Sequence, residues 1–393
     1  MPPLTPSVAD AGPLELLVLQ PTPFCNINCS YCYLPDRQST KKMSPETLRQ
    51  VLDWVFSSGL AREPFSLLWH AGEPLMMPVD FYEEAMTLLG RANRSGVTVY
   101  HSFQTNATLI DPRWCDFFLR HDVHLGVSVD GPDFLHDRCR RTRQGAGTLD
   151  RVLRGIRLLS EHQVPFFALT VLTAESLAYP DELFDFYQTN GIGSIGFNVE
   201  EIEGPHISSS LLGPGIRGRF RRFFQRFLDL ACSADPPLVV REFETSMADL
   251  LGPRYGPGSR TQENKPWAIV NVDWEGNFST YSPELLGISS PRHGSFALGN
   301  VARDRLEDVI ASEHFRLLEE EIARGVEMCR QQCPYFAFCG GSAPANKFFE
   351  NGTFASTETM SCRLQKQVCL DVSLAWLENH RPVRSQASEP THA

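Results

Sequence analysis

The chain has 393 residues, of which 42% are hydrophobic and 21% are charged, and its formal net charge is −11. A chain of this length can bury a full catalytic domain and a smaller appended region. Its acidic balance argues against nucleic acid as the main partner, because phosphate binding needs a cationic surface. No apolar run reaches the roughly 18 residues that a membrane span needs, and residues 1–13 lack the basic-then-apolar order of a signal peptide. We therefore expect a cytoplasmic protein with no membrane partner.

Short apolar runs alternate with longer amphipathic stretches over the first half of the chain. The runs predict strands at residues 15–20, 66–70, 97–104, 123–129, 164–172 and 194–199. The stretches between them predict helices at residues 44–58, 79–91, 112–121, 149–162 and 180–190. Alternation of this kind forms right-handed crossovers and a parallel sheet. We expect an α/β fold with a partial (β/α)6 TIM barrel, open on one side, and chemistry at the carboxyl ends of its strands.

The pattern changes after Glu203. Residues 215–232 predict an amphipathic helix, residues 269–281 a β-hairpin, and residues 303–325 a further helical stretch. We divide the chain into a flexible N-terminus (1–13), the barrel (14–205), a helical bridge (206–265), a small cysteine-containing C-terminal domain (266–375) and a flexible tail (376–393). A separate leader-binding domain is not evident, so the barrel or the C-terminal domain would recognise any leader peptide.

The chain has eleven cysteines, which we expect to be thiols or metal ligands because a reducing compartment does not favour structural disulfides. Three of them, Cys25, Cys29 and Cys32, form a CxxxCxxC segment directly after the first predicted strand. Three thiolates at this spacing can hold three corners of a 4Fe–4S cluster and leave the fourth iron open to another ligand. The alternatives are a zinc site that lacks one ligand and three buried thiols.

A second group of cysteines lies near the C-terminus: Cys329, Cys333, Cys339 and Cys362. Four thiolates can fill a 4Fe–4S cluster, and they can equally form a tetrahedral structural zinc site. The other four cysteines stand apart in the sequence, and we interpret them as small buried apolar residues: Cys115, Cys139, Cys232 and Cys369.

The first cysteine segment, with Tyr31 before its last cysteine, resembles the signature of the radical S-adenosylmethionine (SAM) superfamily. Further motifs follow the next three strands in order. His70-Ala-Gly-Glu-Pro74 resembles the GGEP motif, with alanine in place of a glycine, and Gln104-Thr-Asn106, Ser128-Val-Asp130 and His136-Asp-Arg-Cys-Arg140 stand where family members contact SAM. The resemblance implies a SAM site formed by Tyr31, Ala71, Gly72, Glu73, Gln104, Asn106, Ser128, Asp130 and Arg140.

The resemblance also implies the chemistry. Enzymes of this superfamily bind SAM at the open iron of the cluster at Cys25, Cys29 and Cys32. They cleave SAM reductively to a 5'-deoxyadenosyl radical, which removes a hydrogen atom from an unactivated C–H bond. A low-potential electron donor is therefore an expected partner.

The second cysteine group resembles the SPASM extension of radical SAM enzymes that modify peptides. Members with two auxiliary clusters carry a Cys-Asp pair where this chain has Tyr281-Ser282, and a further cysteine where Ser342-Ala343 follows Gly340-Gly341. We therefore expect one auxiliary 4Fe–4S cluster at Cys329, Cys333, Cys339 and Cys362, and hence two clusters in all.

Segments such as Leu17-Val-Leu-Gln-Pro and Tyr281-Ser-Pro-Glu-Leu look most like peptide maturases of the GRRM type, and more distantly like anaerobic sulfatase-maturing enzymes. This implies a ribosomally made precursor peptide of the glycine-rich repeat type. A β-hydrogen is removed and an aromatic ring carbon is joined to that β-carbon, which gives a three-residue cyclophane. Glu200, Glu201 and Glu203 could supply a base or hold the peptide, although we interpret at least two of them as surface carboxylates.

Two alternatives stay open. Sulfatase-maturing relatives use the aspartate of the Cys-Asp pair as a base, so Ser282 at that position argues against formylglycine formation without excluding it. A non-enzymatic iron–sulfur or zinc protein that senses redox state is the other alternative.

Overall fold

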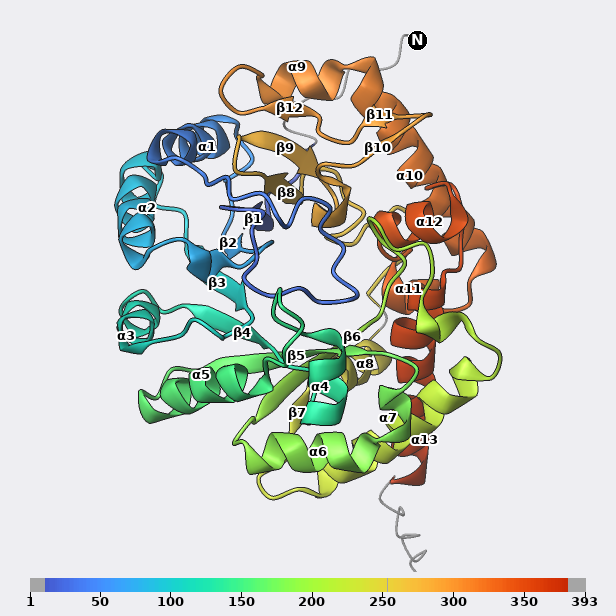
Figure 1. The fold of residues 1–393 in the computed structure, drawn as a ribbon. Helices are drawn as coiled ribbons and strands as arrows, with labels where there is room; N and C mark the ends of the chain where they lie inside the picture. Colours follow the sequence, from blue (N-terminus) through green and yellow to red (C-terminus); the bar gives the residue numbers. More distant parts are fainter. Residues whose placement is uncertain (1–10, 253, 381–393) are drawn as a thin grey trace, which may run out of the picture.

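The computed structural model describes residues 11–252 and 254–380. Six parallel strands form the barrel: β1 (Leu16–Leu19), β2 (Phe65–Trp69), β3 (Val99–Thr105), β4 (His124–Ser128), β5 (Phe166–Leu172) and β6 (Ser194–Val199). The helices between and after them are α1 (Pro45–Ser57), α2 (Val79–Ala92), α3 (Pro112–Arg120), α4 (Asp133–Cys139), α5 (Leu149–Glu161) and α6 (Pro180–Thr189). Figure 1 shows the strands around a central space with the helices outside them. The predicted α/β fold with a mostly parallel sheet is confirmed.

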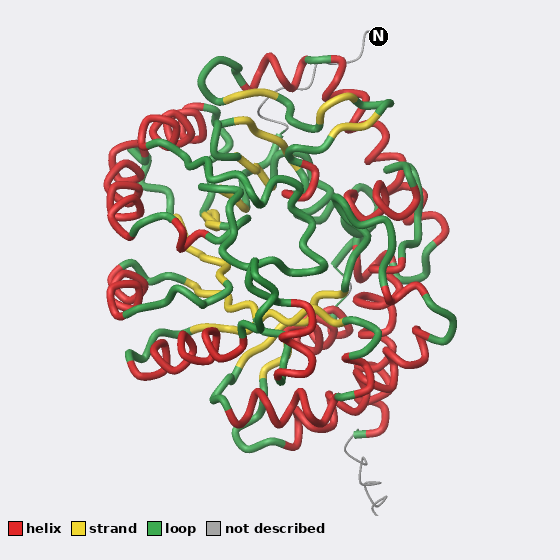
Figure 2. The backbone as a smooth tube through the Cα atoms, in the orientation of Figure 1, coloured by secondary structure: helices red, strands yellow, loops and turns green. Residues whose placement is uncertain are grey.

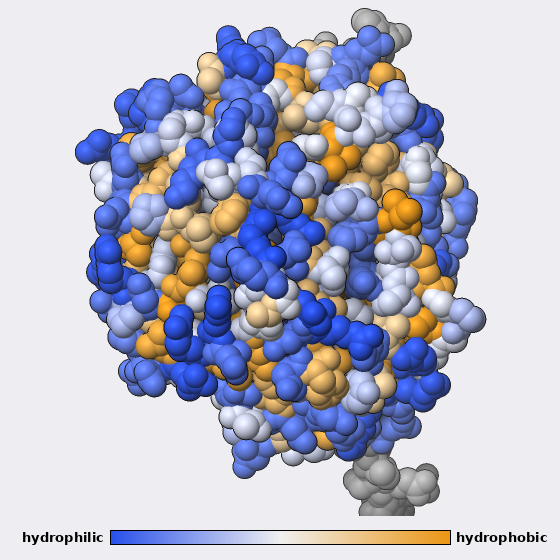
Figure 3. Space-filling view, in the orientation of Figure 1, coloured by the Kyte–Doolittle hydropathy of each residue, from blue (hydrophilic) through white to orange (hydrophobic). Residues whose placement is uncertain are grey.

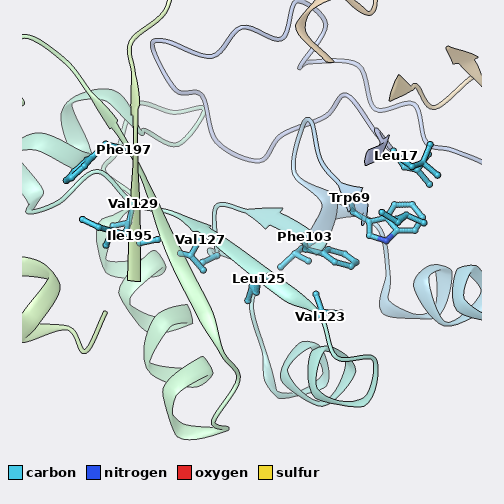
Figure 4. Packing of buried hydrophobic residues seen from close by; sticks show 14 of the residues in the cluster. Leu17, Trp69, Phe103, Val123, Leu125, Val127, Val129, Ile195 and Phe197 are labelled. Atoms are coloured by element: carbon cyan, nitrogen blue, oxygen red, sulfur yellow. The ribbon is translucent and has the colours of Figure 1, made fainter. Parts of the chain in front are cut away.

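The local signals in the sequence explain why these elements form where they do. Ser44 caps α1 by accepting a hydrogen bond from the Thr47 amide at 3.0 Å, and Asp111 caps α3 by accepting from the Trp114 amide at 3.1 Å. Apolar side chains of the strands then pack against the surrounding helices. Figure 4 shows this core, in which Trp69, Phe103 and Leu125 come from three neighbouring strands.

The sheet extends beyond the barrel in a way that the sequence pattern did not predict. The predicted hairpin forms β8 (Ile269–Val272) and β9 (Asn277–Thr280), and β8 pairs in parallel with β1. The complete strand order is β12-β9-β8-β1-β2-β3-β4-β5-β6-β7, with β7 (Val239–Val240) and β12 (Gly299–Asn300) at the two edges. The C-terminal region is therefore continuous with the barrel sheet through a pairing between residues 253 positions apart in sequence.

The helical bridge contains α7 (Ile216–Ser233) and α8 (Arg241–Leu251). The predicted amphipathic helix is confirmed, because α7 buries Phe220, Phe223, Phe224, Phe227 and Leu228 along one face. The helical stretch predicted at 303–325 is interrupted at Ser312, which caps the longer of the two resulting helices. These are α9 (Leu306–Ala311) and α10 (Glu313–Gln332).

The last part of the chain is largely helical: α11 (Phe336–Cys339), α12 (Pro344–Asn351), a π-helix η6 (Cys362–Val368) and α13 (Cys369–Asn379). A short two-stranded sheet, β10 (Ser289–Ser290) with β11 (Gly294–Ser295), precedes them. Figure 2 shows these helices and the loops that lead to them beside the barrel.

The predicted flexible ends need two corrections. Ala11 is buried and the Gly12 amide donates to the Pro266 carbonyl, so residues 11–13 pack against the fold. Residues 376–379 belong to α13 instead of a flexible tail. Residues 1–10 and 381–393 of these two segments lie outside the described residues. None of the helices in the described ranges combines the length and the hydropathy that a membrane span requires.

Candidate active site

The first cysteine group lies in the long loop between β1 and α1, drawn in blue over the centre of the ring of strands (Figure 1). Cys25, Cys29 and Cys32 line a cavity of about 200 Å³, together with residues from the carboxyl ends of the barrel strands. Burial raises the pKa of Cys25 to about 12 and that of Cys29 to about 11. Thiols in such surroundings become thiolates when they bind a cationic metal centre. Hydrophilic side chains surround the hollowed centre of this face (Figure 3).

The segment after β2 locks the cysteine loop in place. Gly72 has φ +58°, and a β-carbon built there would lie 2.4 Å from the Thr22 carbonyl oxygen and 2.6 Å from that of Phe24. The Glu73 amide donates to the Phe24 carbonyl at 2.9 Å. Only glycine therefore allows this close approach, which explains the motif in physical terms.

The Glu73 side chain points the other way and joins β2 to β3. Its carboxylate accepts hydrogen bonds from the Thr105 hydroxyl at 2.6 Å, the Asn106 amide at 2.8 Å and the Leu75 amide at 3.0 Å. Burial raises its pKa to about 7. The Asn106 side chain in turn donates to the Cys25 sulfur at 3.7 Å, so the two motifs and the cysteine loop form one connected structure.

Asp130 and Arg140 form a buried ion pair behind this cavity. Arg140 Nε lies 2.9 Å from Asp130 Oδ2, and the two side chains are 8% and 5% exposed. The Tyr31 hydroxyl donates to the same carboxylate oxygen, and the Val171 amide donates to the other at 3.0 Å. Arg140 Nη1 also lies 4.0 Å from the Cys29 sulfur. Asp130 thus positions Arg140 and Tyr31 beside the first cysteine group.

The structure brings most of the predicted SAM contacts together. Gln104 donates to the Ser128 hydroxyl at 2.9 Å, and the following predicted residues line the cavity: Tyr31, Gly72, Glu73, Gln104, Asn106, Ser128 and Arg140. Two predicted contacts do not line it. Asp130 lies behind Arg140, and Ala71 is 3% exposed with φ +69°, so its role is in the turn itself.

Several residues in the cavity and in the loop beside it were missed by sequence reasoning. Tyr33 and His70 both line it, and the Tyr33 hydroxyl lies 3.1 Å from His70 Nε2. Burial lowers the pKa of His70 to about 4, so its ring is neutral at neutral pH. Arg37 donates to the Cys29 carbonyl at 2.6 Å and Arg143 to the Cys25 carbonyl at 2.8 Å, which fixes the cysteine loop. Tyr33 follows Cys32 directly, and His70 lies two residues before the Gly-Glu-Pro motif. This proximity in the sequence could have identified both as residues of the cavity.

The three carboxylates after β6 are not exposed surface groups, and the interpretation of two of them as such is wrong. Glu200 accepts from the Ser210 amide at 2.8 Å, and Glu201 accepts from Asn346 Nδ2 at 2.9 Å and from the Ser361 hydroxyl at 2.8 Å. Glu203 is 6% exposed and accepts from Asn346 Nδ2 at 3.3 Å. Glu201 and Glu203 line the first cavity and also a second one.

The second cavity has a volume of about 450 Å³ and lies between the barrel and the C-terminal region. Its acidic wall includes Glu201, Glu203 and Glu284, and two of the C-terminal cysteines, Cys339 and Cys362, also line it. Burial, followed by the negative charges of Glu201 and Glu284, raises the pKa of Glu203. Burial and the charge of Glu201 also raise the pKa of Glu284. The cavity thus holds carboxyl groups that bind a proton more tightly than they would in water.

The four C-terminal cysteines lie near one another, and two of them, Cys339 and Cys362, line the second cavity. Cys329 lies in the last turns of α10, Cys333 follows that helix, Cys339 ends α11 and Cys362 begins η6. Burial raises the pKa of Cys339 to about 11, and the charges of Cys333, Cys329 and Cys362 contribute to the rise. The Thr359 amide donates to the Cys362 sulfur at 3.2 Å, and the Tyr335 and Gly341 amides partly oppose the rise in pKa that burial causes at Cys333 and Cys339.

Hydrogen bonds to sulfur are a common feature of thiolates that bind iron–sulfur clusters, and the donor set fits such a group. Within residues 11–252 and 254–380, no three His, Cys, Asp or Glu side chains are placed to hold a single metal ion. The cysteines outside the two groups differ in burial: Cys115 and Cys369 are buried, Cys139 is intermediate and Cys232 is exposed. Our interpretation of these as buried apolar residues is therefore wrong for Cys232.

Comparison with known proteins gives a consistent result. The model of the radical SAM superfamily matches residues 19–187. An uncharacterized protein of Synechocystis is 41% identical over 94% of both chains. A serine-type anaerobic sulfatase-maturating enzyme of Bacteroides thetaiotaomicron is 27% identical, with 86% of this chain and 84% of that protein covered.

Two solved structures share the fold. The enzyme anSMEcpe with bound AdoMet has a TM-score of 0.74 at 21% identity, with 93% of this chain and 98% of that chain covered. Streptococcus suis SuiB bound to precursor peptide SuiA has a TM-score of 0.59 at 16% identity, with 91% and 76% covered.

Proposed function

Because this chain belongs to the radical SAM superfamily of enzymes, we propose that it matures a ribosomally made peptide by forming a carbon–carbon crosslink. The proposed product joins an aromatic ring carbon to the β-carbon of a nearby residue, in a precursor of the glycine-rich repeat type. Similarity to a sulfatase-maturating enzyme and a fold shared with the peptide-bound SuiB support a peptide or protein substrate.

The residues of the first cavity would hold a 4Fe–4S cluster through Cys25, Cys29 and Cys32, and SAM through the groups beside them. The fit rests on buried thiols that the Asn106 and Arg140 side chains approach. When bound, these cofactors supply a radical that removes a hydrogen atom from an unactivated C–H bond, and an auxiliary cluster at the C-terminal cysteines supplies an electron acceptor. The barrel residues have the tasks of orienting SAM and the peptide and of excluding water.

The observation that carries the proposal is the pair of adjoining cavities that share Glu201 and Glu203. Crosslinking removes two hydrogens from the peptide: one leaves as a hydrogen atom, and the other as a proton and an electron. A base must therefore lie beside the reacting residues. Glu203 and Glu284 are placed for this role, and because burial raises their pKa values, the ionised form of either group is a stronger base than a carboxylate in water. Two of the four cysteines that would hold the electron acceptor, Cys339 and Cys362, line the same second cavity.

Formylglycine formation is the second candidate, because named relatives of this chain mature sulfatases. The structure offers one argument against it. Ser282, at the position where such relatives carry their aspartate, is 6% exposed and has a hydroxyl in place of a carboxylate. Glu284 is placed to act as the base in either reaction. Only the identity of the product therefore distinguishes crosslinking from formylglycine formation.

The test begins with anaerobic reconstitution with iron and sulfide, followed by dithionite and SAM, with chromatographic detection of 5'-deoxyadenosine. We expect its formation by the wild type and by Cys232→Ala, a control at an exposed isolated cysteine, and none by the triple variant Cys25→Ala/Cys29→Ala/Cys32→Ala. A fully loaded protein that forms none, even with peptides present, would favour the redox-sensor alternative.

Products are then compared on two synthetic probes, a glycine-rich repeat peptide with aromatic residues and a sulfatase-type peptide with Ser or Cys at the modified position. Crosslinking lowers the mass by two hydrogens, leaves no aldehyde and suppresses fragmentation between the joined residues. Oxidation of serine to formylglycine gives the same mass change, but the product reacts with a hydrazine probe. An aldehyde on the sulfatase-type peptide, with no change in the repeat peptide, would replace our proposal by the second candidate.

A further inference from the structure

Lys347 is a buried lysine at the C-terminal cysteine group. It lies on α12 and is 2% exposed. Its Nζ donates to the Gly325 carbonyl at 3.0 Å and to the Cys329 sulfur at 3.3 Å. These hydrogen bonds go to a backbone carbonyl and a thiol, and neither acceptor is a carboxylate. The ammonium group is therefore aimed at a cysteine from inside the protein.

A buried ammonium is costly unless an opposite charge lies close to it. A neutral thiol at Cys329 would leave Lys347 without such a charge. A thiolate bound to an iron–sulfur cluster would supply it, because the cluster with its four thiolates is anionic. The charge of Lys347 also reaches Cys333, where it opposes the rise in pKa that burial causes.

The donors to the four sulfurs differ in charge. Cys362 accepts a hydrogen bond from the Thr359 amide, and neutral backbone amides act on Cys333 and Cys339, whereas Cys329 accepts from an ammonium group. Reduction adds negative charge to a cluster, and a nearby cation stabilises that charge. Hydrogen bonding and local charge at the sulfurs are among the factors that set cluster potentials.

The first cysteine group also has a cation near it, but that cation is compensated. Arg140 lies 4.0 Å from the Cys29 sulfur and pairs with Asp130 at 2.9 Å, so its charge is largely neutralised locally. A cluster that cleaves SAM needs a low potential, whereas one that accepts an electron from the peptide needs a higher one. Arg140, whose charge Asp130 compensates, is consistent with a low potential at the first cluster. Lys347, which has no carboxylate partner, is consistent with a higher potential at the auxiliary cluster.

We propose that Lys347 is a positioning residue that raises the reduction potential of the auxiliary cluster and so suits it to accept the electron released on peptide oxidation. The inference rests on the auxiliary cluster of the proposed function. In the overall step the peptide loses one hydrogen atom to the SAM-derived radical, one proton to a carboxylate and one electron to the auxiliary cluster.

The test is an anaerobic redox titration monitored by electron paramagnetic resonance. The full chain carries Cys25→Ala/Cys29→Ala/Cys32→Ala, so that only the auxiliary cluster contributes. Lys347→Met removes the charge and Lys347→Arg keeps it. Lys366→Met is the matched control, because Lys366 is an exposed lysine four residues after the ligand Cys362. Solvent screens its charge, whereas burial preserves that of Lys347.

We expect Lys347→Met to shift the reduction equilibrium at least tenfold toward the oxidised cluster, which is about 59 mV for a one-electron couple. Lys347→Arg and Lys366→Met should stay close to the parent. An unchanged potential in fully loaded Lys347→Met, or an equal shift in Lys366→Met, would overturn the inference.

If Lys347→Met binds no iron, the iron content of Lys347→Arg shows whether a positive charge is required at this position. A cluster recovered with arginine supports a required charge, and loss of iron with both residues contradicts it. Absence of iron from the triple cysteine variant itself would instead remove the auxiliary cluster from the proposed function, and the inference with it. The two failures are therefore distinguishable.

Discussion

The substitution Asp130→Asn should destabilise the protein strongly, because it leaves a buried guanidinium without its counter-charge. Asp130 and Arg140 are 5% and 8% exposed, and the ion pair spans 2.9 Å. Asparagine keeps the shape of the side chain and can still accept from the Val171 amide. It cannot supply the negative charge, and removing one partner of a buried ion pair costs about 3–5 kcal/mol.

Urea unfolding followed by fluorescence of the six tryptophans would measure this loss as a fall in the midpoint at constant slope. The matched control is Asp181→Asn. Its partner is Arg226, and both side chains are about half exposed, at 50% and 52%. An exposed pair contributes about 0–1 kcal/mol, so this variant should unfold almost like the wild type.

A second variant separates charge from packing. Asp130→Asn/Arg140→Met removes the unpaired cation as well, and it should recover part of the stability lost in Asp130→Asn. The reasoning is refuted if Asp130→Asn and Asp181→Asn differ by less than about 1 kcal/mol with unchanged slopes. The loss of stability caused by Arg140→Met in the otherwise wild-type protein is the reference for this comparison. The reasoning is also refuted if Arg140→Met lowers the stability of Asp130→Asn by that same amount.

Three further predictions concern the motifs of the first cavity. Gly72→Ala should lose the cysteine loop, because its β-carbon would lie 2.4 Å from a carbonyl oxygen, and reconstituted iron should fall by one cluster, whereas Gly90→Ala in open space on α2 should keep it. The variant Cys25→Ala/Cys29→Ala/Cys32→Ala should keep about four irons per chain by iron analysis, since ligand loss removes one cluster only; unchanged iron would contradict the assignment. Burial raises the pKa of Glu73 from 4.5 to about 7, so the folded carboxyl keeps a proton that the unfolded one has released. The free energy of unfolding should therefore fall by roughly 3 kcal/mol between pH 4.5 and 7, and urea midpoints of Glu73→Gln should lack this slope.

The barrel could be predicted because its signals are local. Each strand is a short apolar run, each helix repeats apolar residues at helical spacing, and caps such as Ser44 and Asp111 mark where helices begin. The motifs after β1 to β4 could be placed together for the same reason, since the carboxyl ends of parallel strands meet at one edge. Gly72, Glu73 and Asn106 therefore lie where sequence reasoning put them.

The remaining features depend on contacts between distant segments. Nothing in the hairpin pattern of residues 269–281 indicates that β8 pairs with β1. Asp130 pairs with Arg140, ten residues further along the chain. The spacing of the two residues in the sequence does not distinguish this ion pair from a direct contact between Asp130 and SAM. Lys347 looks like any helix-surface lysine until the fold buries it against Cys329.

The pairing of β8 with β1 also explains why the two cavities adjoin. The strand β9 follows β8 antiparallel, and the turn after it carries Tyr281, Ser282 and Glu284 to the wall of the second cavity. The segment after β6 brings Glu201 and Glu203 to the same wall from the other end of the barrel. Asn346 on α12 then bridges Glu201 and Glu203, and Lys347, the next residue, contacts Cys329. One short helix thus links the carboxylates suited to accept the proton to the cysteines suited to hold the electron acceptor, so a change in α12 should affect both functions together.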